Sequence, residues 1–259
     1  MYEKHPVFAE PENKDGKIWR YIDFTKFTSM IDGRSLFFVK ASKLRDPYEG
    51  TMPEYNDQIR RSVYESQKQN FKDDDQFEKF LQSTPKGLRA TYKQNKETML
   101  INSWHENDYE SASMWQLYSQ GNSGIAIQST FKKLYECFSK NIEDKIWIGK
   151  VKYLDFKKEW MDEGNIFDPF IIKRKSFSSE MEIRALTLHP EDPISNQKGQ
   201  KQDRLIENGM YVPVDLEILI EKIYVSPFAQ NWVTKTIQSV ATKFHLNKEI
   251  IQSDLYALD

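Results

Sequence analysis

The sequence predicts a single α+β domain with a mixed or antiparallel sheet and flanking helices. Apolar stretches of strand length alternate irregularly with stretches of helical periodicity, and no run of regular βαβ units appears. The 10 glycines and 10 prolines are scattered as isolated turn signals, so no flexible linker divides residues 1–259. A chain of this length can still be organised around one hydrophobic core.

The first hundred residues predict a lead-in, a strand–helix–strand unit and a helical insertion. Residues 1–17 are charged and irregular, whereas 18–22 (IWRYI) and 35–41 (SLFFVKA) have strand composition, with an apolar stripe of helical spacing between them. After the turn RDPYEG, residues 54–98 become charged and polar with scattered aromatic side chains. This segment predicts two or three helices, interrupted at DDD and again at TPKG (84–87).

The rest of the chain predicts alternating strands and helices. A buried strand is expected at 99–104 and a helix at 109–120, and the polar stretch 189–209 has the composition of a long mobile loop. The further elements expected are a strand within 121–130, a helix at 129–142, a strand at 146–156, a strand at 210–216, a short helix at 216–221, a strand at 222–227 and a long amphipathic helix opened by Ser226-Pro227.

Composition argues against several classes of protein. The net charge is −2, from 37 basic and 39 acidic residues, so no overall field draws the chain to nucleic acid or to an anionic membrane. The single Cys137 excludes an intramolecular disulfide and a cysteine-rich zinc site, as is typical of a reducing compartment. The N-terminal segment has charges where a secretory signal needs an apolar core, and no apolar run approaches the roughly 20 residues of a membrane span. We therefore expect a cytoplasmic protein.

The stretch KSFSSEMEIRAL (175–186) carries the strongest indication of function. As a strand it would place Glu180, Glu182 and Arg184 on one face, with side chains two positions apart standing about 7 Å from each other. Such a face could form one wall of a cleft. It could equally be a solvated face whose charges pair across neighbouring strands.

Five segments are characteristic when taken together: WRYIDFTKFTSMIDGRSLFFVKASKLRDPYEG, SWHENDYESASMWQLYS, GIAIQST, KRKSFSSEMEIRAL and IYVSP. They resemble a bacterial family that is catalogued as a domain of unknown function and numbered twenty-nine seventy-one. The resemblance spans Trp19 to about Ser253, so it implies one domain. It also implies a prokaryotic cytoplasmic protein of the kind encountered near phage-defence genes.

Three residue groups occur in an order that resembles ADP-ribosyltransferases. Arg20 lies in the first strand, Ser129 or Tyr118 follows in the middle of the chain, and Glu180-Met-Glu182 comes late. Members of that family use an Arg or His, then a Ser, Thr or Tyr, then a Glu that often belongs to a Glu-x-Glu pair. The resemblance implies a split-sheet core, NAD as the substrate, and ADP-ribosyl transfer or NAD hydrolysis as the activity.

The same resemblance gives each residue a role. Cleavage of the nicotinamide–ribose bond passes through an oxocarbenium-like state, which a carboxylate stabilises without a metal. Glu182 would hold the ribose, Glu180 would orient the acceptor, and Arg20 would grip the pyrophosphate. The acceptor macromolecule and the oligomeric state, for which a homo-oligomer is one option, stay open. The candidate NAD-binding residues are Arg20, Tyr21, Tyr118 and Ser129, with Trp19 and Trp115 as further aromatic walls.

Two other classes of function compete with this one. A metal-dependent phosphodiesterase or nuclease would hold Mg²⁺ with Asp46, Glu49 and Glu182. Such sites commonly have a Lys two residues after the last acid, whereas this chain has Arg184, which is too firmly protonated to act as a base. The second class is a non-catalytic protein that binds a ligand or a partner in its aromatic clefts.

Several of the candidate residues also have a structural interpretation. Arg20 could lay its stem over the core and pair with Asp46, and Asp46 could simply cap its own turn. His105 could be a hydrogen-bonded structural residue rather than a general acid or base. With four widely spaced histidines and one cysteine, the sequence argues against a zinc site.

Overall fold

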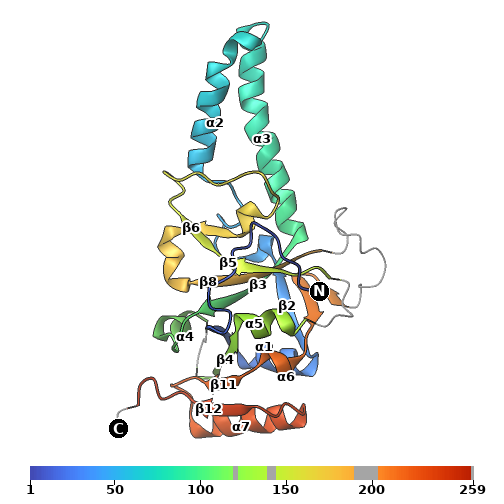
Figure 1. Cartoon of the computed structure of the whole chain (residues 1–259), viewed down its shortest axis with the longest axis vertical. Coiled ribbons are helices and arrows are strands. Elements are labelled where there is room, and N and C mark those ends of the chain that lie inside the picture. The colour runs from blue at the N-terminus through green and yellow to red at the C-terminus, as the bar shows by residue number, and fades with distance from the viewer. Residues whose placement is uncertain (119–121, 139–143, 190–203, 258–259) are drawn as a thin grey trace.

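The computed structural model describes residues 1–118, 122–138, 144–189 and 204–257. Within these ranges the chain forms one ten-stranded mixed sheet and a separate sheet of two strands (Figure 1). The small sheet pairs β6 (Lys152–Leu154) with β7 (Ile172–Arg174) in parallel. The large sheet has the order β12 (Glu249–Gln252), β11 (Lys222–Val225), β4 (Gly124–Thr130), β1 (Lys17–Asp23), β3 (Met99–Glu106), β2 (Ser35–Lys40), β10 (Gly209–Pro213) and β9 (Leu205–Ile206), with β8 (Glu182–Leu188) and β5 (Trp147–Lys150) beside β3.

The large sheet splits at β3. One edge of β3 pairs with β8 over nearly its whole length, from Met99 opposite Leu188 to His105 opposite Glu182. Its other edge pairs with β1 at one end and with β2 at the other. The space along β3 between β1 and β2 is called the sheet gap below. This arrangement confirms the predicted α+β class with a split, mixed sheet.

Seven α-helices and four 3₁₀ helices of the described residues accompany the sheets. The α-helices are α1 (Phe24–Asp32), α2 (Glu54–Ser66), α3 (Asp74–Thr98), α4 (Ala112–Tyr118), α5 (Phe131–Glu136), α6 (Leu216–Leu219) and α7 (Asn231–Lys243). The 3₁₀ helices are η1 (Ala41–Lys43), η2 (Lys68–Asn70), η3 (Asp168–Phe170) and η4 (Lys175–Glu180). No helix in the described part of the chain is long and apolar enough to cross a membrane.

Alternation along β1 distributes its side chains between two hydrophobic clusters. Ile18 and Ile22 join the main core together with side chains of α1, α5, α6 and α7, whereas Trp19 and Tyr21 pack on the other face against α4. Arg20 therefore projects from the face that carries Ile18 and Ile22. Because His105 lies opposite both Trp19 and Glu182, Glu182 belongs to the other face. The pairing thus places Arg20 and Glu182 on opposite faces.

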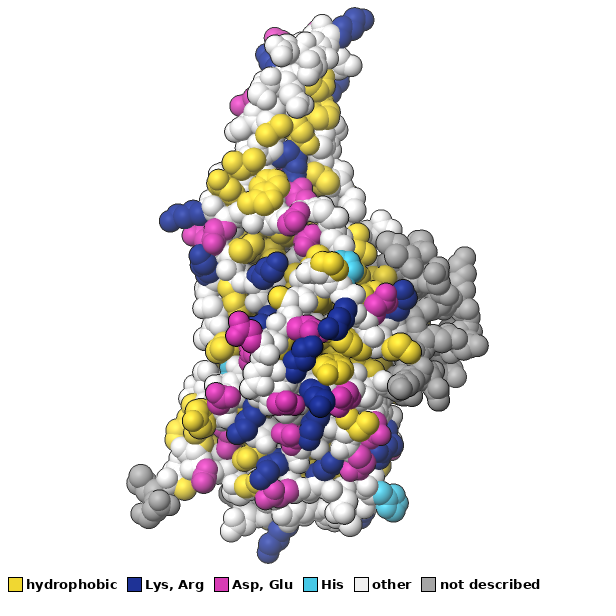
Figure 2. Space-filling view, in the orientation of Figure 1, with side chains coloured by type: hydrophobic (Ala, Val, Ile, Leu, Met, Phe, Trp, Pro, Cys, Tyr) yellow, Lys and Arg dark blue, Asp and Glu magenta, His cyan; other side chains and the backbone are white. Residues whose placement is uncertain are grey.

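The helices expected within 54–98 form a long hairpin that projects from the body (Figure 1). Four aromatic rings, those of Tyr64, Phe71, Phe77 and Phe80, contact one another within it. The predicted interruption at 84–87 is wrong, because α3 runs unbroken from Asp74 to Thr98. Over the body, acidic and basic side chains are interspersed on the face shown in Figure 2, as the net charge of −2 suggests.

The segment 175–186 differs from the expected continuous strand. Residues up to Glu180 form η4, and β8 begins only at Glu182. Between them Met181 takes the left-handed conformation, with φ 38° and ψ 56°. Glu180 and Glu182 therefore do not share a strand face by alternation. Their side chains instead converge on Lys173, which contacts both carboxylates.

Three smaller differences concern other elements. The last long helix begins at Asn231 rather than at Ser226-Pro227, and β12 was not predicted. The predicted strand at 146–156 is divided into β5 and β6, which belong to different sheets. The expected loop at 189–209 lies mostly outside the described residues.

Candidate active site

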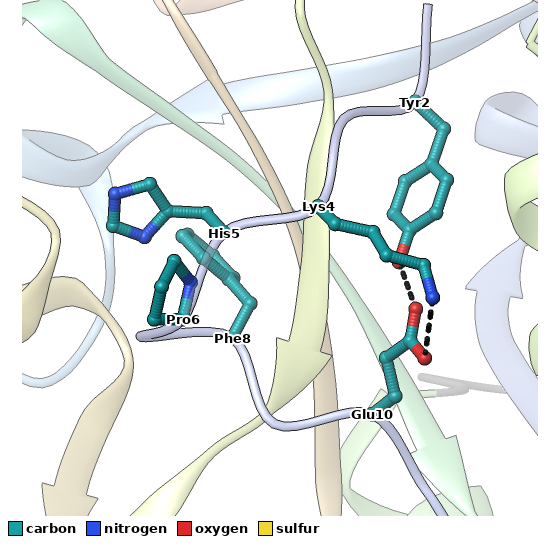
Figure 3. Close-up of a pocket in the computed structure, with 6 residues that line it drawn as sticks. All are labelled: Tyr2, Lys4, His5, Pro6, Phe8 and Glu10. Carbon is teal, nitrogen blue, oxygen red and sulfur yellow. Dashed lines mark hydrogen bonds and ion pairs between the residues drawn. The ribbon is translucent and has the colours of Figure 1, made fainter.

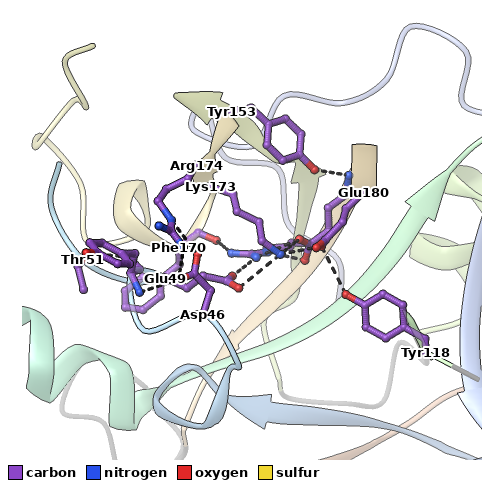
Figure 4. Close-up of polar contacts among 12 residues, drawn as sticks. Asp46, Glu49, Thr51, Tyr118, Tyr153, Phe170, Lys173, Arg174 and Glu180 are labelled. Atoms are coloured by element: carbon purple, nitrogen blue, oxygen red, sulfur yellow. Dashed lines mark hydrogen bonds and ion pairs between the residues drawn. The ribbon is translucent and has the colours of Figure 1, made fainter. Parts of the chain in front are cut away.

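Five charged side chains meet beside β8 and form the ionic cluster: Glu49, Lys173, Glu180, Glu182 and Arg184 (Figure 4). They come from four segments, namely the turn after β2, strand β7, the end of η4 and the start of β8. All five are buried, and the Arg184 side chain is only 1% exposed. Glu180, Glu182 and Arg184 of KSFSSEMEIRAL thus belong to an interior charge cluster rather than to a solvated face.

Arg184 occupies the centre of the cluster and uses its whole fork. Nε and Nη2 donate to the two oxygens of Glu182 at 2.7 and 3.0 Å. Nη2 also donates to Glu49, and Nη1 donates to the carbonyl oxygen of Phe170 at 2.8 Å. A bidentate guanidinium–carboxylate pair is the geometry that best repays the desolvation of both ions.

Lys173, from β7 of the small sheet, contacts all three acids. Its Nζ lies 2.7 Å from Oε2 of Glu180, 3.4 Å from Oε2 of Glu182 and 3.4 Å from Oε1 of Glu49. The ring of Phe177 lies 5.0 Å from the same nitrogen. Lys173 is therefore the cation that holds Glu180, which Arg184 does not contact.

Five of the six carboxylate oxygens in the cluster have a charged partner among the described residues, and Oε1 of Glu180 does not. Both oxygens of Glu49 and both of Glu182 contact Arg184 or Lys173. Oε2 of Glu180 accepts from Lys173 and from the Tyr118 hydroxyl, the latter at 3.4 Å. Oε1 of Glu180 has no partner among the described residues, and it is not among the fully enclosed polar atoms that lack one. It is thus the one oxygen of the cluster that is available to a ligand.

The environment separates the two acids electrostatically. Burial alone would raise the pKa of Glu182, but Arg184, together with Lys173 and the Ser103 side chain, outweighs it and holds that pKa well below its usual value. Burial raises the pKa of Glu180, and Lys173 only partly offsets this effect. The Tyr118 hydroxyl beside Glu180 has its pKa raised to about 12, mainly by burial, so it acts as a neutral hydrogen-bond donor. A pair of carboxyl groups with opposite shifts is a frequent sign of a functional centre.

Two further groups fix the backbone around the acids. The Nδ1 atom of His105 lies 2.6 Å from the carbonyl oxygen of Glu180, and the Tyr153 hydroxyl accepts a hydrogen bond from the Glu182 amide at 2.8 Å. Tyr118 and Tyr153 approach from different sides (Figure 4). Nε2 of His105 is buried and has no partner among the described residues. The structural interpretation of His105 therefore accounts for one ring nitrogen and leaves the other unused.

Arg20 does not reach the ionic cluster. Its guanidinium turns into the sheet gap, where Nη1 donates to the carbonyl oxygen of Ser103 at 2.7 Å and the group lies 6.0 Å from the Trp104 ring. It has no acidic partner among the described residues, and burial lowers its pKa to about 10. The alternative pairing with Asp46 is wrong, because Asp46 bonds Arg174 instead, at 3.0 Å. Nε and Nη2 of Arg20 have no hydrogen-bond acceptor among the described residues.

Of the other candidate residues, Tyr118 reaches the acids, and Tyr21 and Ser129 do not. Tyr118 contacts Glu180 directly, whereas the Tyr21 hydroxyl accepts from the Ser111 amide and its ring packs on Trp115. Ser129 is fully buried, and its hydroxyl donates to the Leu219 carbonyl of α6. The structure thus brings together Glu180, Glu182 and Tyr118, and it leaves Arg20, Tyr21 and Ser129 apart from them.

The carboxylates of the nuclease alternative do not converge on one open position. Asp46 pairs with Arg174 and caps its own turn by accepting from the Tyr48 amide at 3.1 Å, while Glu49 and Glu182 share Arg184. Among the described residues no group of three acids, histidines or cysteines is placed to hold a metal ion. The expectation that no metal takes part stays a prediction.

A surface hollow of about 370 Å³ lies on the N-terminal segment and is lined by Tyr2, Lys4, His5, Pro6, Phe8 and Glu10 (Figure 3). Tyr2 donates to Glu10, which also pairs with Lys4 and Lys14. Because the charges of the two lining residues Lys4 and Glu10 cancel, this hollow offers less to a charged ligand than the free oxygen of Glu180 does.

Lys173 and Tyr153 are the site residues that sequence reasoning missed. Both lie in the small parallel sheet, and only the pairing of that sheet brings them beside β8. The available signal was a lysine within IIKRK, a short apolar stretch just before the Glu-x-Glu pair. A lysine at such a place needs a buried acid as its partner.

Comparison with known proteins gives only a distant likeness. No family model matches the chain, and no curated protein matches it. Among solved structures, Thermus sp. 2.9 DarT in complex with NAD⁺ matches with a TM-score of 0.39 and 9% identity, covering 95% of this chain and 98% of that one. Thermus sp. 2.9 DarT in complex with ADP-ribosylated ssDNA matches with a TM-score of 0.40 and 7% identity, covering 95% and 96%. At this level the likeness assigns no activity to the chain.

Proposed function

We propose that the chain cleaves the nicotinamide–ribose bond of NAD and passes the ADP-ribosyl group to an acceptor hydroxyl or to water. The supporting observation is Oε1 of Glu180, a carboxylate oxygen that has no partner among the described residues, in a cluster whose other five carboxylate oxygens are paired. A carboxylate at this place would oppose the positive charge that develops on the ribose ring in the transition state.

The proposal reverses the two roles first assigned to the acids. Glu182 is held bidentately by Arg184, so its carboxylate is not free to follow a substrate. Glu180 has the free oxygen and a raised pKa, as suits a group that must accept a proton near neutral pH. Glu182 then supports the site by keeping Arg184 and Lys173 in place.

The reaction balances with the groups present. The acceptor oxygen forms a bond to C1′ of the ribose while the bond between C1′ and the nicotinamide nitrogen breaks. The electron pair of the breaking bond stays on that nitrogen, so nicotinamide leaves as a neutral molecule. The proton of the acceptor passes to Oε1 of Glu180. That Arg20 binds the pyrophosphate stays a prediction: its guanidinium lies on the opposite sheet face from Glu182, so the same NAD molecule would have to extend from the ionic cluster into the sheet gap. We also propose that the chain belongs to the family of unknown function named above and that it acts in phage defence.

Nicotinamide release from NAD tests the proposal. We expect release by the purified protein, and a loss of about 10²- to 10³-fold in the Glu180→Gln variant, as is usual when one transition-state electrostatic contact is removed. The matched control is Glu159→Gln, because Glu159 is a half-buried acid that pairs with Lys175 outside the cluster. Wild-type protein that releases no nicotinamide, or a Glu180→Gln variant with full activity, would contradict the proposal. Divalent-cation-dependent cleavage of DNA or RNA would support the nuclease alternative instead.

A further inference from the structure

The ionic cluster contains three carboxylates but only two cations. Lys173 is the cation that contacts Glu180, so it is placed to control the orientation and the charge of that carboxylate. We propose that Lys173 is the positioning residue of the site: it holds Oε2 of Glu180 and thereby presents Oε1 to the substrate as part of a carboxylate. This inference rests on the proposed function for the identity of the substrate. The effect of Lys173 on Glu180 can be tested without knowing the substrate.

The contacts of Lys173 match the donors of a lysine. An ammonium group has three N–H bonds, and Nζ of Lys173 lies near three separate acids, at 2.7 Å from Glu180 and 3.4 Å from Glu49 and Glu182. The Lys173 side chain is 7% exposed, so water replaces little of this coordination. A single buried point charge is thus shared among the three acids, and its shortest contact is to Glu180.

No other cation of the described residues takes this role. Arg184 is fully used by Glu182, Glu49 and the Phe170 carbonyl. The neighbouring Arg174 is bound to Asp46 at 3.0 Å and lies over the Tyr48 ring. If Lys173 were lost, Glu180 would keep only the Tyr118 hydroxyl as a side-chain partner, at 3.4 Å.

Charge balance links this geometry to the protonation of Glu180. With both cations present the five ionised groups sum to one negative charge, and burial already raises the pKa of Glu180. Burial would lower the pKa of Lys173, but Glu182 and Glu49 outweigh it and keep that pKa above its usual value, so the ammonium stays charged. The groups that face Glu180 are Lys173 from β7, Glu182 and Arg184 from β8, Glu49 from the turn after β2, Tyr118 from α4, Tyr153 from β6 and His105 from β3.

Lys173 makes the shortest of these contacts to Glu180, so its removal would raise the pKa of that carboxyl further and favour the neutral form. A neutral carboxyl could neither oppose positive charge on a ribose nor accept a proton. Without the lysine contact, Oε2 would also be free to rotate into the position of Oε1. Lys173 would therefore affect the reaction without touching the substrate.

The decisive measurement is the pKa of Glu180 from carboxyl ¹³C shifts of glutamate-labelled protein, with the signal assigned by its absence in Glu180→Gln. We expect Lys173→Met to raise that pKa by roughly one to three units, the usual effect of losing one close opposite charge. The more conservative Lys173→Arg should leave it within about one unit of the wild-type value. Lys175→Met is the matched control, because Lys175 is 58% exposed and pairs with Glu159, and it should change nothing.

An unchanged pKa of Glu180 in folded Lys173→Met protein would overturn the inference. Because three acids with a single cation strain the fold, the same substitution is also made in a Glu49→Gln background, where the excess charge is smaller. In the nicotinamide assay, Lys173→Met should shift the acid limb of the kcat profile upward by the same number of pH units, and Lys173→Arg should restore it. If the wild type releases no nicotinamide, the proposed function fails, while the shift measured by NMR still supports or overturns the role of Lys173.

Discussion

The ionic cluster holds three acids and two cations in mutual contact, whereas the guanidinium in the sheet gap has no acidic partner among the described residues. In the cluster, Arg184 and Lys173 satisfy five of the six carboxylate oxygens. In the gap, Arg20 donates one hydrogen bond to a backbone carbonyl and keeps two nitrogens unused. Paired buried charges support the fold, and unpaired ones mark positions where a ligand can complete the pairing.

The largest effect should come from breaking the pairing in the cluster. Arg184→Met leaves Glu182 and Glu49 buried without their main cation, so we expect the free energy of unfolding to fall by about 3–5 kcal/mol. Urea denaturation followed by tryptophan fluorescence measures this loss. Adding Glu182→Gln to the same variant should recover part of it, and a single variant as stable as the wild type would show that the cluster contributes no pairing energy.

Acid should weaken the same pairing, and the two neighbouring acids should respond in opposite ways. The pKa of Glu182 in the folded state lies below its ordinary value of 4.5, so its contribution is complete above about pH 4.5 and is lost as the pH falls toward about 2. The pKa of Glu180 is raised, so its ionisation costs stability at neutral pH and protonation relieves that cost.

Urea midpoints measured from pH 7 to pH 3 separate these contributions. Glu182→Gln should lower stability at pH 7 and reduce the loss of stability between pH 7 and pH 3. Glu180→Gln should leave stability at pH 7 unchanged or slightly higher. Equal behaviour of the two variants would remove the distinction between a structural and a functional acid.

In the sheet gap the expected effect is on binding rather than on stability. Arg20→Met removes a charged donor whose hydrogen-bond acceptor among the described residues is the Ser103 carbonyl rather than an acid, so we expect ADP-ribose to bind about tenfold to a hundredfold more weakly while the fold stays intact. Isothermal titration calorimetry measures the affinity. Lys17→Met is the control, because Lys17 lies on the same strand and bonds the Asp108 carbonyl at the surface. Binding that Arg20→Met leaves unchanged would place the phosphate site elsewhere.

The smallest expected effect concerns the backbone between the two acids. Met181 has φ 38°, a conformation that glycine adopts without strain, and its side chain is 48% exposed. Met181→Gly should therefore stabilise the fold slightly, by about 0.5–1 kcal/mol, and should keep the Glu180 and Glu182 contacts. Thermal unfolding measures the change. A clear loss of stability would mean that the Met181 side chain contributes packing that its exposure does not suggest.

Local sequence patterns correctly predicted the elements that depend mainly on neighbouring residues. Strands β1 and β2 and helix α1 follow directly from alternation and from the helical stripe at the N-terminal end. The error at Thr84–Gly87 arose because turn-forming residues were given more weight than the long helical pattern around them. The strand β12 was missed because its four residues pair only with β11, which no local signal reveals.

The candidate site was predictable in its residue types but not in its pairing. The sequence pointed to Glu180, Glu182 and Tyr118, and the structure brings these together. It could not show that Glu182 is saturated by Arg184, since a residue two positions away on a strand can point at its neighbour or at solvent. It also could not show that Arg20 enters the gap, because that depends on how β3 shares its edge between β1 and β2.

That shared strand has a consequence for how the chain folds. β3 lies mid-sequence and bonds β1, about eighty residues earlier, and β8, about eighty residues later. During synthesis, the first half can form helices and a hairpin, yet the edge of β3 that later carries β8 stays bare until that segment leaves the ribosome. Contacts of such long range should make folding slow, with completion only after translation has passed β8.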